Sequence, residues 1–231
     1  MEESAFGRLV AVLFSPGKTF EAIARRPTWV VGIIVLALLG AAVTYVGFTK
    51  VDPDSFIEMM REQGREMPAD GPSPEQMVEF SKWAGVIGAL LVSPIVYAVM
   101  ALLFWVSLRM LGSEMDFVRS LSVAIHGSVP LGVAAIIGIP VALGRSEMSM
   151  EELQGGQYLM SNLGFLAGDE TSAVVRALLT SVDLFSIWCI VLLTIGYRIV
   201  ARVTRGAALA VTLAVWALGV LLKVAMAAAF S

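Results

Sequence analysis

Two opposite charges, Asp183 and Lys223, lie in long apolar stretches of this chain, on either side of the basic turn 198–206. A charge surrounded by hydrocarbon is costly, so it needs a partner or a functional role. At the rise of an α-helix, the two residues lie roughly 22 and 25 Å from that turn along their helices. Their similar depth predicts an interhelical ion pair near the outer leaflet. The alternative is that each side chain extends separately to the outer interface.

The single histidine of the sequence, His126, also lies in an apolar stretch, four residues before Pro130. An intramembrane imidazole beside a proline kink is suited to a proton relay. We favour the alternative of a neutral ring that hydrogen-bonds a neighbouring helix. A lone histidine does not supply the ligand set of a metal site, so we expect neither a metal nor another cofactor. Ser186 and Thr194 follow Asp183 at helical spacing and complete the set of intramembrane polar candidates.

Motifs that would indicate an enzyme are missing from the sequence. It has no glycine-rich phosphate loop ending in lysine, no dinucleotide fingerprint and no helix with paired zinc histidines. With one histidine, a Ser–His–Asp set is not evident, so we predict a protein that is not an enzyme and has no catalytic residue. Methionines in the two long loops could bind Cu(I), but without cysteine or histidine companions we favour the alternative that they pack short loop helices against the membrane surface. These methionines are Met59, Met60, Met67, Met77, Met148, Met150 and Met160.

Membrane-spanning helices must position these residues. Hydrophobic residues make up 58% of the chain and charged residues 15%, whereas an ordinary soluble domain is about 25% charged. The apolar residues form five blocks of the roughly twenty residues that a helix needs to cross a bilayer. We predict an all-α fold, a bundle of five transmembrane helices, with kinks at Pro94 and Pro130. The transmembrane domain is 28–231; its spans are about 29–49, 84–108, 120–143, 177–197 and 207–230, and its outer loops are 50–83 and 144–176.

Residues 1–27 form a separate amphipathic segment. Ser15 is a good N-cap, and Pro16 suits the first position of a helix. Phe20 and Ile23 share one face of that helix, while its polar side carries lysine and arginine. We predict a short amphipathic helix that lies along the membrane surface. The alternative is a plain basic flank that only sets the topology.

Basic residues are unevenly distributed between the segments that connect the spans. Segments 1–27, 109–119 and 198–206 together hold nine bases and five acids, while the two long loops hold six bases and thirteen acids. Because short basic segments face the cytoplasm, we predict a cytoplasmic N-terminus and an outer C-terminus, in the plasma (inner) membrane of a bacterium. The net charge of −3 argues against a nucleic-acid partner.

Two stretches give the chain a resemblance to a known family. The first runs from Phe14-Ser15-Pro16 through Thr19-Phe20 to Pro27-Thr28-Trp29, and the second is Asp183-Leu184-Phe185-Ser186-Ile187-Trp188. In these stretches the chain resembles the Yip family, the Ypt-interacting membrane proteins, in its short prokaryotic form. The resemblance implies five spans and a cytoplasmic N-terminus. Eukaryotic members look like scaffolds that work with Rab-type GTPases in vesicle traffic, and the family supplies no catalytic residues to carry over.

The function predicted from these observations is that of a non-enzymatic membrane scaffold in membrane organisation or protein assembly. Its expected partners are membrane lipids and either further copies of the chain or other membrane proteins. The alternative is a small transporter or channel that uses the polar residues of spans three to five. A close-packed interior would favour the scaffold, and a water-filled polar cavity reaching past mid-membrane would favour transport.

Overall fold

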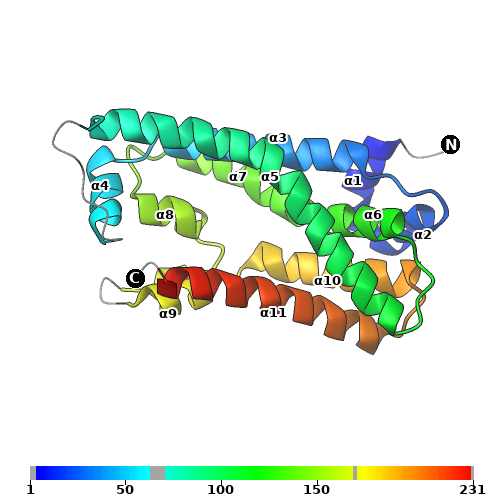
Figure 1. The fold of residues 1–231 in the computed structure, drawn as a ribbon. Coiled ribbons are helices and arrows are strands. Elements are labelled where there is room, and N and C mark those ends of the chain that lie inside the picture. The colour runs from blue at the N-terminus through cyan, green and yellow to red at the C-terminus, as the bar shows by residue number, and fades with distance from the viewer. Residues whose placement is uncertain (1–3, 63–70, 169–170, 230–231) are drawn as a thin grey trace. The chain divides into compact units, whose positions relative to one another are not determined.

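A computed structural model describes residues 4–62, 71–168 and 171–229 (Figure 1). Its regular elements are α-helices and two short 3-10 helices, η1 and η2, and these residues form no β-strand. In chain order they are α1 (Ala5–Phe14), α2 (Pro16–Arg25), α3 (Val30–Phe48), α4 (Pro53–Glu62), α5 (Pro74–Met110), α6 (Phe117–Gly127), α7 (Val129–Leu143), α8 (Met150–Gly155), η1 (Gln157–Leu159), η2 (Leu163–Leu166), α9 (Ala173–Leu179), α10 (Leu184–Val200) and α11 (Arg205–Ala229). The predicted all-α class is therefore confirmed.

Four helical stretches among the described residues are long and apolar enough to cross a membrane. They are Val30–Phe48, Pro74–Met110, Phe117–Leu143 and Arg205–Ala229. The third consists of α6 and α7, which are separated at Ser128, two residues before Pro130. α5 continues as one helix through Pro94. The kinks at the two prolines stay predictions.

The fourth predicted span, 177–197, is not one helix. α9 ends at Leu179, and α10 begins only at Leu184 and has 17 residues. The reason is local hydrogen bonding: the hydroxyl groups of Thr180 and Ser181 donate to main-chain carbonyls of α9, at 2.9 and 2.6 Å. Such side-chain bonds compete with helix continuation. Asp183 consequently stands just before α10 rather than within a helix.

Chain contacts divide the molecule into two compact units. Unit 1 comprises Met1–Leu38, Leu91–Val133 and Phe185–Gly219, and unit 2 comprises Leu39–Leu90, Ala134–Leu184 and Val220–Ser231. Several long helices contribute residues to both units. Each unit has its own apolar cluster.

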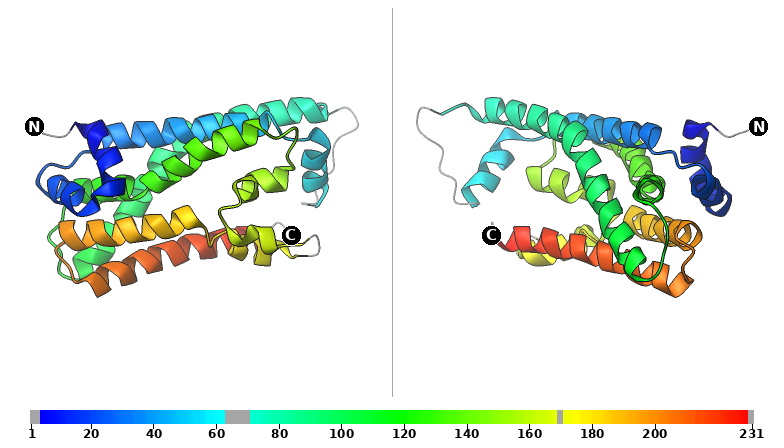
Figure 2. Two further views of the ribbon diagram at one scale, coloured as in Figure 1. Left: turned by 180° about the vertical axis from the view of Figure 1, so that it is seen from behind. Right: turned by 45° about the vertical axis from the view of Figure 1, so that its right-hand side comes forward.

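Unit 1 has a core in which α2 packs against α1 and α6 (Figure 2). Phe20 and Ile23 of α2 are fully buried in this core, with Phe104, Val123 and Tyr197. The apolar face that the sequence predicts for a membrane surface therefore contacts protein. The membrane-surface role of this helix stays a prediction.

Unit 2 brings the two predicted outer loops together. The main-chain N–H of Met148 donates to Lys50 O at 2.7 Å, and that of Met150 donates to Ser55 Oγ at 3.2 Å. Four methionines of these loops, Met59, Met60, Met77 and Met150, join one apolar cluster with Phe56. These four methionines therefore pack within the protein, and the packing of the loop helices against the membrane surface stays a prediction. Met67 lies outside the described residues.

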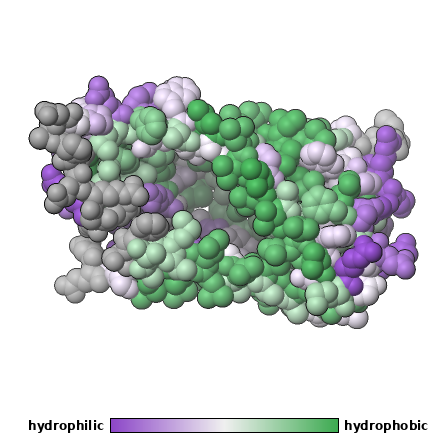
Figure 3. Space-filling model, in the orientation of Figure 1, coloured by the Kyte–Doolittle hydropathy of each residue, from purple (hydrophilic) through white to green (hydrophobic). Residues whose placement is uncertain are grey.

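Large apolar side chains are exposed along α5 and α11, where hydrophobic residues gather on the surface in Figure 3. Ile95 is 60% exposed and Leu221 is 65% exposed. Contiguous exposed apolar surface of this kind is rare on a soluble monomer. A hydrocarbon solvent explains it, because lipid tails cover apolar side chains at no cost.

Candidate functional site

His126 lies near the end of α6 and is 1% exposed. Its Nδ1 lies 2.8 Å from Ser122 O, one helical turn earlier. Because a carbonyl can only accept, Nδ1 carries a proton, and Nε2 of the neutral ring is left as an acceptor. Nε2 is buried and has no hydrogen-bond partner among the described residues. The hydrogen bond of Nδ1 is therefore made within α6, and the predicted hydrogen bond to a neighbouring helix stays a prediction.

Arg8 is a second buried polar group of unit 1, and sequence reasoning missed it. This residue of α1 is 6% exposed, and its charge acts electrostatically on His126. Its Nη1 donates to Arg26 O at 2.8 Å, while Arg119 Nε of α6 donates to Ala24 O at 2.8 Å. Two guanidinium groups thus bind the free carbonyls at the end of α2, where the helix dipole favours cations. The sequence feature that could have revealed Arg8 is its position in an otherwise apolar helix.

Tyr197 is fully buried in unit 1 and connects three of its helices. Its hydroxyl donates to Ser120 O at 3.1 Å, and its ring stacks on Phe104 with 4.1 Å between centroids. Ser120 Oγ in turn donates to Ala101 O at 2.8 Å. These contacts join α5, α6 and α10. The hydroxyl groups of Tyr197 and Ser120 find their hydrogen-bond partners within unit 1.

Two glycines let α6 and α10 approach closely. A Cβ atom at Gly127 would lie 2.4 Å from Leu193 Cδ2, and one at Gly196 would lie 2.7 Å from Val123 Cγ1 and 2.8 Å from Phe20 Cε1. Small residues at helix contacts are typical of membrane bundles. Thr194, a predicted polar candidate, is buried beside this contact, and its hydroxyl has no partner among the described residues. Ser186 lies on the same helix and is half-buried.

Asp183 and Lys223 both lie in unit 2, each beside a hydroxyl group. Ser161 Oγ donates to Asp183 Oδ2 at 2.5 Å, and Lys223 Nζ donates to Thr180 Oγ1 at 2.7 Å. The Asp183 charge also acts electrostatically on Lys223. Sequence reasoning missed both hydroxyl groups, because Ser161 lies in a loop without helical period and Thr180 lies within the continuous span predicted for 177–197. Their position follows from the pairing of 161–163 with 182–184 through main-chain hydrogen bonds.

The ion pair of Asp183 and Lys223 stays a prediction, and charge reversal tests it. Asp183→Lys places two cations together, so we expect a large loss of folded protein after detergent extraction. Adding Lys223→Asp restores opposite charges and is expected to recover most of that yield. Thr180→Val is the matched control, since it removes only the hydroxyl that accepts from Lys223. Failure of the double exchange to recover the yield would show that the two charges act independently.

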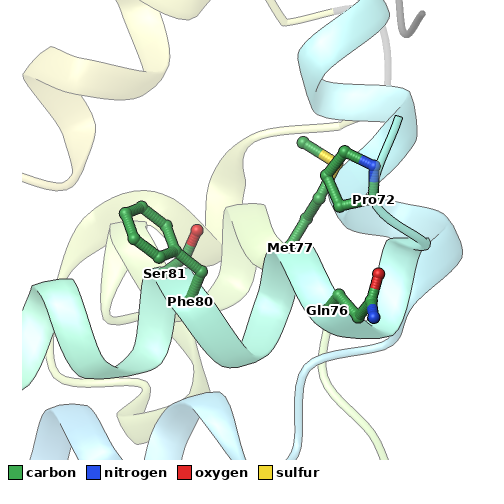
Figure 4. Close-up of a pocket in the computed structure, with 5 residues that line it drawn as sticks. All are labelled: Pro72, Gln76, Met77, Phe80 and Ser81. Atoms are coloured by element: carbon green, nitrogen blue, oxygen red, sulfur yellow. The ribbon is translucent and has the colours of Figure 1, made fainter. Parts of the chain in front are cut away.

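A pocket of about 280 Å³ lies at the start of α5 in unit 2 (Figure 4). It is lined by Pro72, Gln76, Met77, Phe80 and Ser81. None of these side chains is ionisable, and none of the polar candidates lines the pocket. Its lining therefore offers no acid, base or strong nucleophile.

The described geometry gives the polar candidates no catalytic arrangement. His126 is bonded to a main-chain carbonyl rather than to a nucleophile or a carboxylate. Within the described parts of the chain, no three histidine, cysteine, aspartate or glutamate side chains gather as metal ligands. The candidates fall into two groups, His126, Ser186 and Thr194 in unit 1 and Asp183 and Lys223 in unit 2.

Comparisons with known proteins agree with the resemblance read from the two stretches. The family model described as the Yip1 domain matches residues 10–226, which include both stretches. The chain is also similar to membrane protein YknW of Bacillus subtilis (strain 168), with 25% identity over 206 residues that cover 86% of this chain and 80% of that protein. No solved structure matches. The predicted resemblance is confirmed.

Proposed function

The chain belongs to the Yip1 domain family, and on that premise we propose that it is a non-enzymatic scaffold that organises the membrane or assembles proteins within it. The observation that carries this proposal is the close packing of unit 1. At Gly196 even a methyl group would collide with two fully buried side chains, Val123 and Phe20. A transport pathway needs hydrated polar space, and such close packing leaves none at this contact.

The proposed topology has five crossings, with α10 as the fourth in chain order. Its 17 residues span roughly 26 Å, close to the hydrocarbon thickness of about 30 Å, and the difference can be met by local thinning of the bilayer. The basic segments are joined within unit 1: Ser113 Oγ donates to Ala201 O at 2.9 Å, and Arg119 Nε donates to Ala24 O. This clustering supports a shared cytoplasmic side, with the C-terminus outside.

The proposed location is the plasma (inner) membrane of a bacterium. The proposed partners are lipids and either further copies of the chain or other membrane proteins. A scaffold is expected to leave gently solubilised membranes in an assembly of defined mass, which native mass spectrometry measures. A bare monomer under every mild extraction would argue against this role.

A small transporter or channel remains the second candidate because unit 1 contains buried polar atoms that have no hydrogen-bond partner among the described residues. These atoms are Arg8 Nε, Thr28 Oγ1, His126 Nε2 and Thr194 Oγ1. A chain of such groups is found along proton and ion pathways. The two candidates differ in one measurable property, the ion permeability of a membrane that contains the purified chain.

Flux into proteoliposomes separates the candidates. For a scaffold we expect proton, sodium and potassium uptake equal to that of empty liposomes. His126→Ala and Asp183→Asn are expected to leave this background unchanged. Uptake above background that either substitution abolishes would establish the transport function instead.

A further inference from the structure

α1 has an exposed apolar face of its own. Phe6, Val10 and Phe14 recur at every fourth residue and are 58%, 47% and 81% exposed. This spacing places them along one side of the helix. Leu9 and Val12 lie on the other side and are buried in unit 1. The side of α1 that faces the protein thus combines these apolar residues with the buried Arg8, and the side that faces away is also apolar.

α1 lies at the level where the first crossing helix begins. A Cβ atom at Gly32, the third residue of α3, would lie 3.0 Å from Leu9 Cδ2. Two residues correspond to only about 3 Å along a helix. The left panel of Figure 2 shows α1 running across the direction of α3. A helix across the start of a span has the position and orientation of an interfacial helix.

The first turns of α3, which α1 approaches, meet lipid in the proposed topology. Val30, Ile34 and Leu38 of α3 are 49%, 51% and 56% exposed. The bilayer must cover these residues if α3 crosses it. Because α1 approaches α3 at Gly32, its own exposed apolar face lies at the level where this lipid begins.

The charge beside this face favours an anionic lipid surface. Residues 5–26 contain four bases and one acid. Lys18 and Arg25 of α2 are exposed, as is the single acid, Glu21. Exposed bases next to an apolar helix attract the negative headgroups of a cytoplasmic leaflet.

We propose that α1 inserts its Phe6–Val10–Phe14 face into the cytoplasmic leaflet, while Lys18 and Arg25 contact the phosphates of anionic lipids. This inference rests on the proposed function and its cytoplasmic N-terminus. The sequence predicts the lipid contact for the apolar face of α2, but protein covers that face. The proposal assigns the contact to α1 instead. Through its buried face the same helix connects the leaflet to the core of unit 1.

Spin-label accessibility of the full chain tests this proposal. Nitroxide labels are placed at Val10→Cys, at Ile34→Cys as the lipid reference and at Thr204→Cys, an exposed residue of the basic turn before α11, as the water reference, each in a Cys189→Ala background. The protein is reconstituted in nanodiscs of phosphatidylcholine with or without phosphatidylglycerol. We expect the Val10 label to be open to oxygen and shielded from a nickel chelate, like the Ile34 label. Phosphatidylglycerol should move the Val10 label deeper into the bilayer, and Lys18→Gln should abolish this change in depth.

Each of the other possible results of this experiment would refute one part of the proposal. Nickel access at Val10 equal to that at Thr204, with Ile34 in lipid, would refute insertion of α1 but leave the spans intact. Shielding of Val10 from both reagents would show that protein covers this face. Equal depth in the two lipid mixtures would refute the anionic contact. Nickel access at Ile34 as well would refute the proposed membrane topology itself.

Discussion

Gly196→Leu is expected to destabilise the folded protein by about 3 kcal/mol, at the upper end of the cost of overpacking a core. A side chain at this position would meet Val123 Cγ1 at 2.7 Å and Phe20 Cε1 at 2.8 Å. Both neighbours are fully buried, so neither can move aside without disturbing the core of unit 1. The measurement is the midpoint of thermal unfolding of the detergent-purified protein, followed by loss of its monodisperse elution peak.

Gly219→Leu is the matched control for this prediction. Gly219 also lies in an apolar helix, α11, but a Cβ atom there would have no neighbour within 4 Å. Leucine is a better helix former than glycine, so this variant should be as stable as the parent or slightly more stable. Equal midpoints for the two variants would mean that α6, α10 and α2 do not pack closely at Gly196.

Phe20→Ala is expected to cost about 3 to 5 kcal/mol, the usual range for removing a buried aromatic ring. Phe20 is fully buried in the core of unit 1, where its ring contacts the backbone region of Gly196. Its loss leaves a cavity between α2, α6 and α10 and should weaken the attachment of the N-terminal helices. Thermal unfolding measures the stability, and limited proteolysis of α2 measures the attachment.

Phe14→Ala provides the comparison, because it removes the same ring from the preceding helix, where it is 81% exposed. This variant should unfold within a few degrees of the parent, since surface substitutions usually change stability by less than about 0.5 kcal/mol. If Phe14→Ala and Phe20→Ala were equally mild, α2 would lie on the membrane surface with its apolar face outside the core. That result would restore the interpretation drawn from the sequence.

Composition alone predicts the membrane-spanning character of this chain, because the length and apolarity of a crossing helix are set by the bilayer. The break before α10 could not be predicted in this way. Residues 177–183 are apolar enough to extend a span, but Thr180 and Ser181 end α9 through their own side-chain hydrogen bonds. Such local competition depends on side-chain conformation, which hydropathy does not include.

The sequence identifies the candidate polar residues, but it does not identify the groups that lie beside them in the fold. Asp183 and Lys223 stand out in the sequence, yet the hydroxyl groups beside them come from Ser161 and Thr180, in or next to an irregular loop. Arg8 escaped notice because a lone arginine near a terminus usually remains solvated. In the fold it binds the carbonyl end of α2, a long-range contact that no periodicity encodes.

The most direct test of the account is the sidedness of two single cysteines in sealed vesicles. Glu58→Cys lies in α4 of the first outer loop, and Thr204→Cys lies in the basic turn before α11; both positions are exposed, and Cys189→Ala supplies the background. A membrane-impermeant maleimide is added to right-side-out and inside-out inner-membrane vesicles. The account predicts that Glu58→Cys reacts only in right-side-out vesicles and Thr204→Cys only in inside-out vesicles. Reaction of both cysteines from the same side would contradict it.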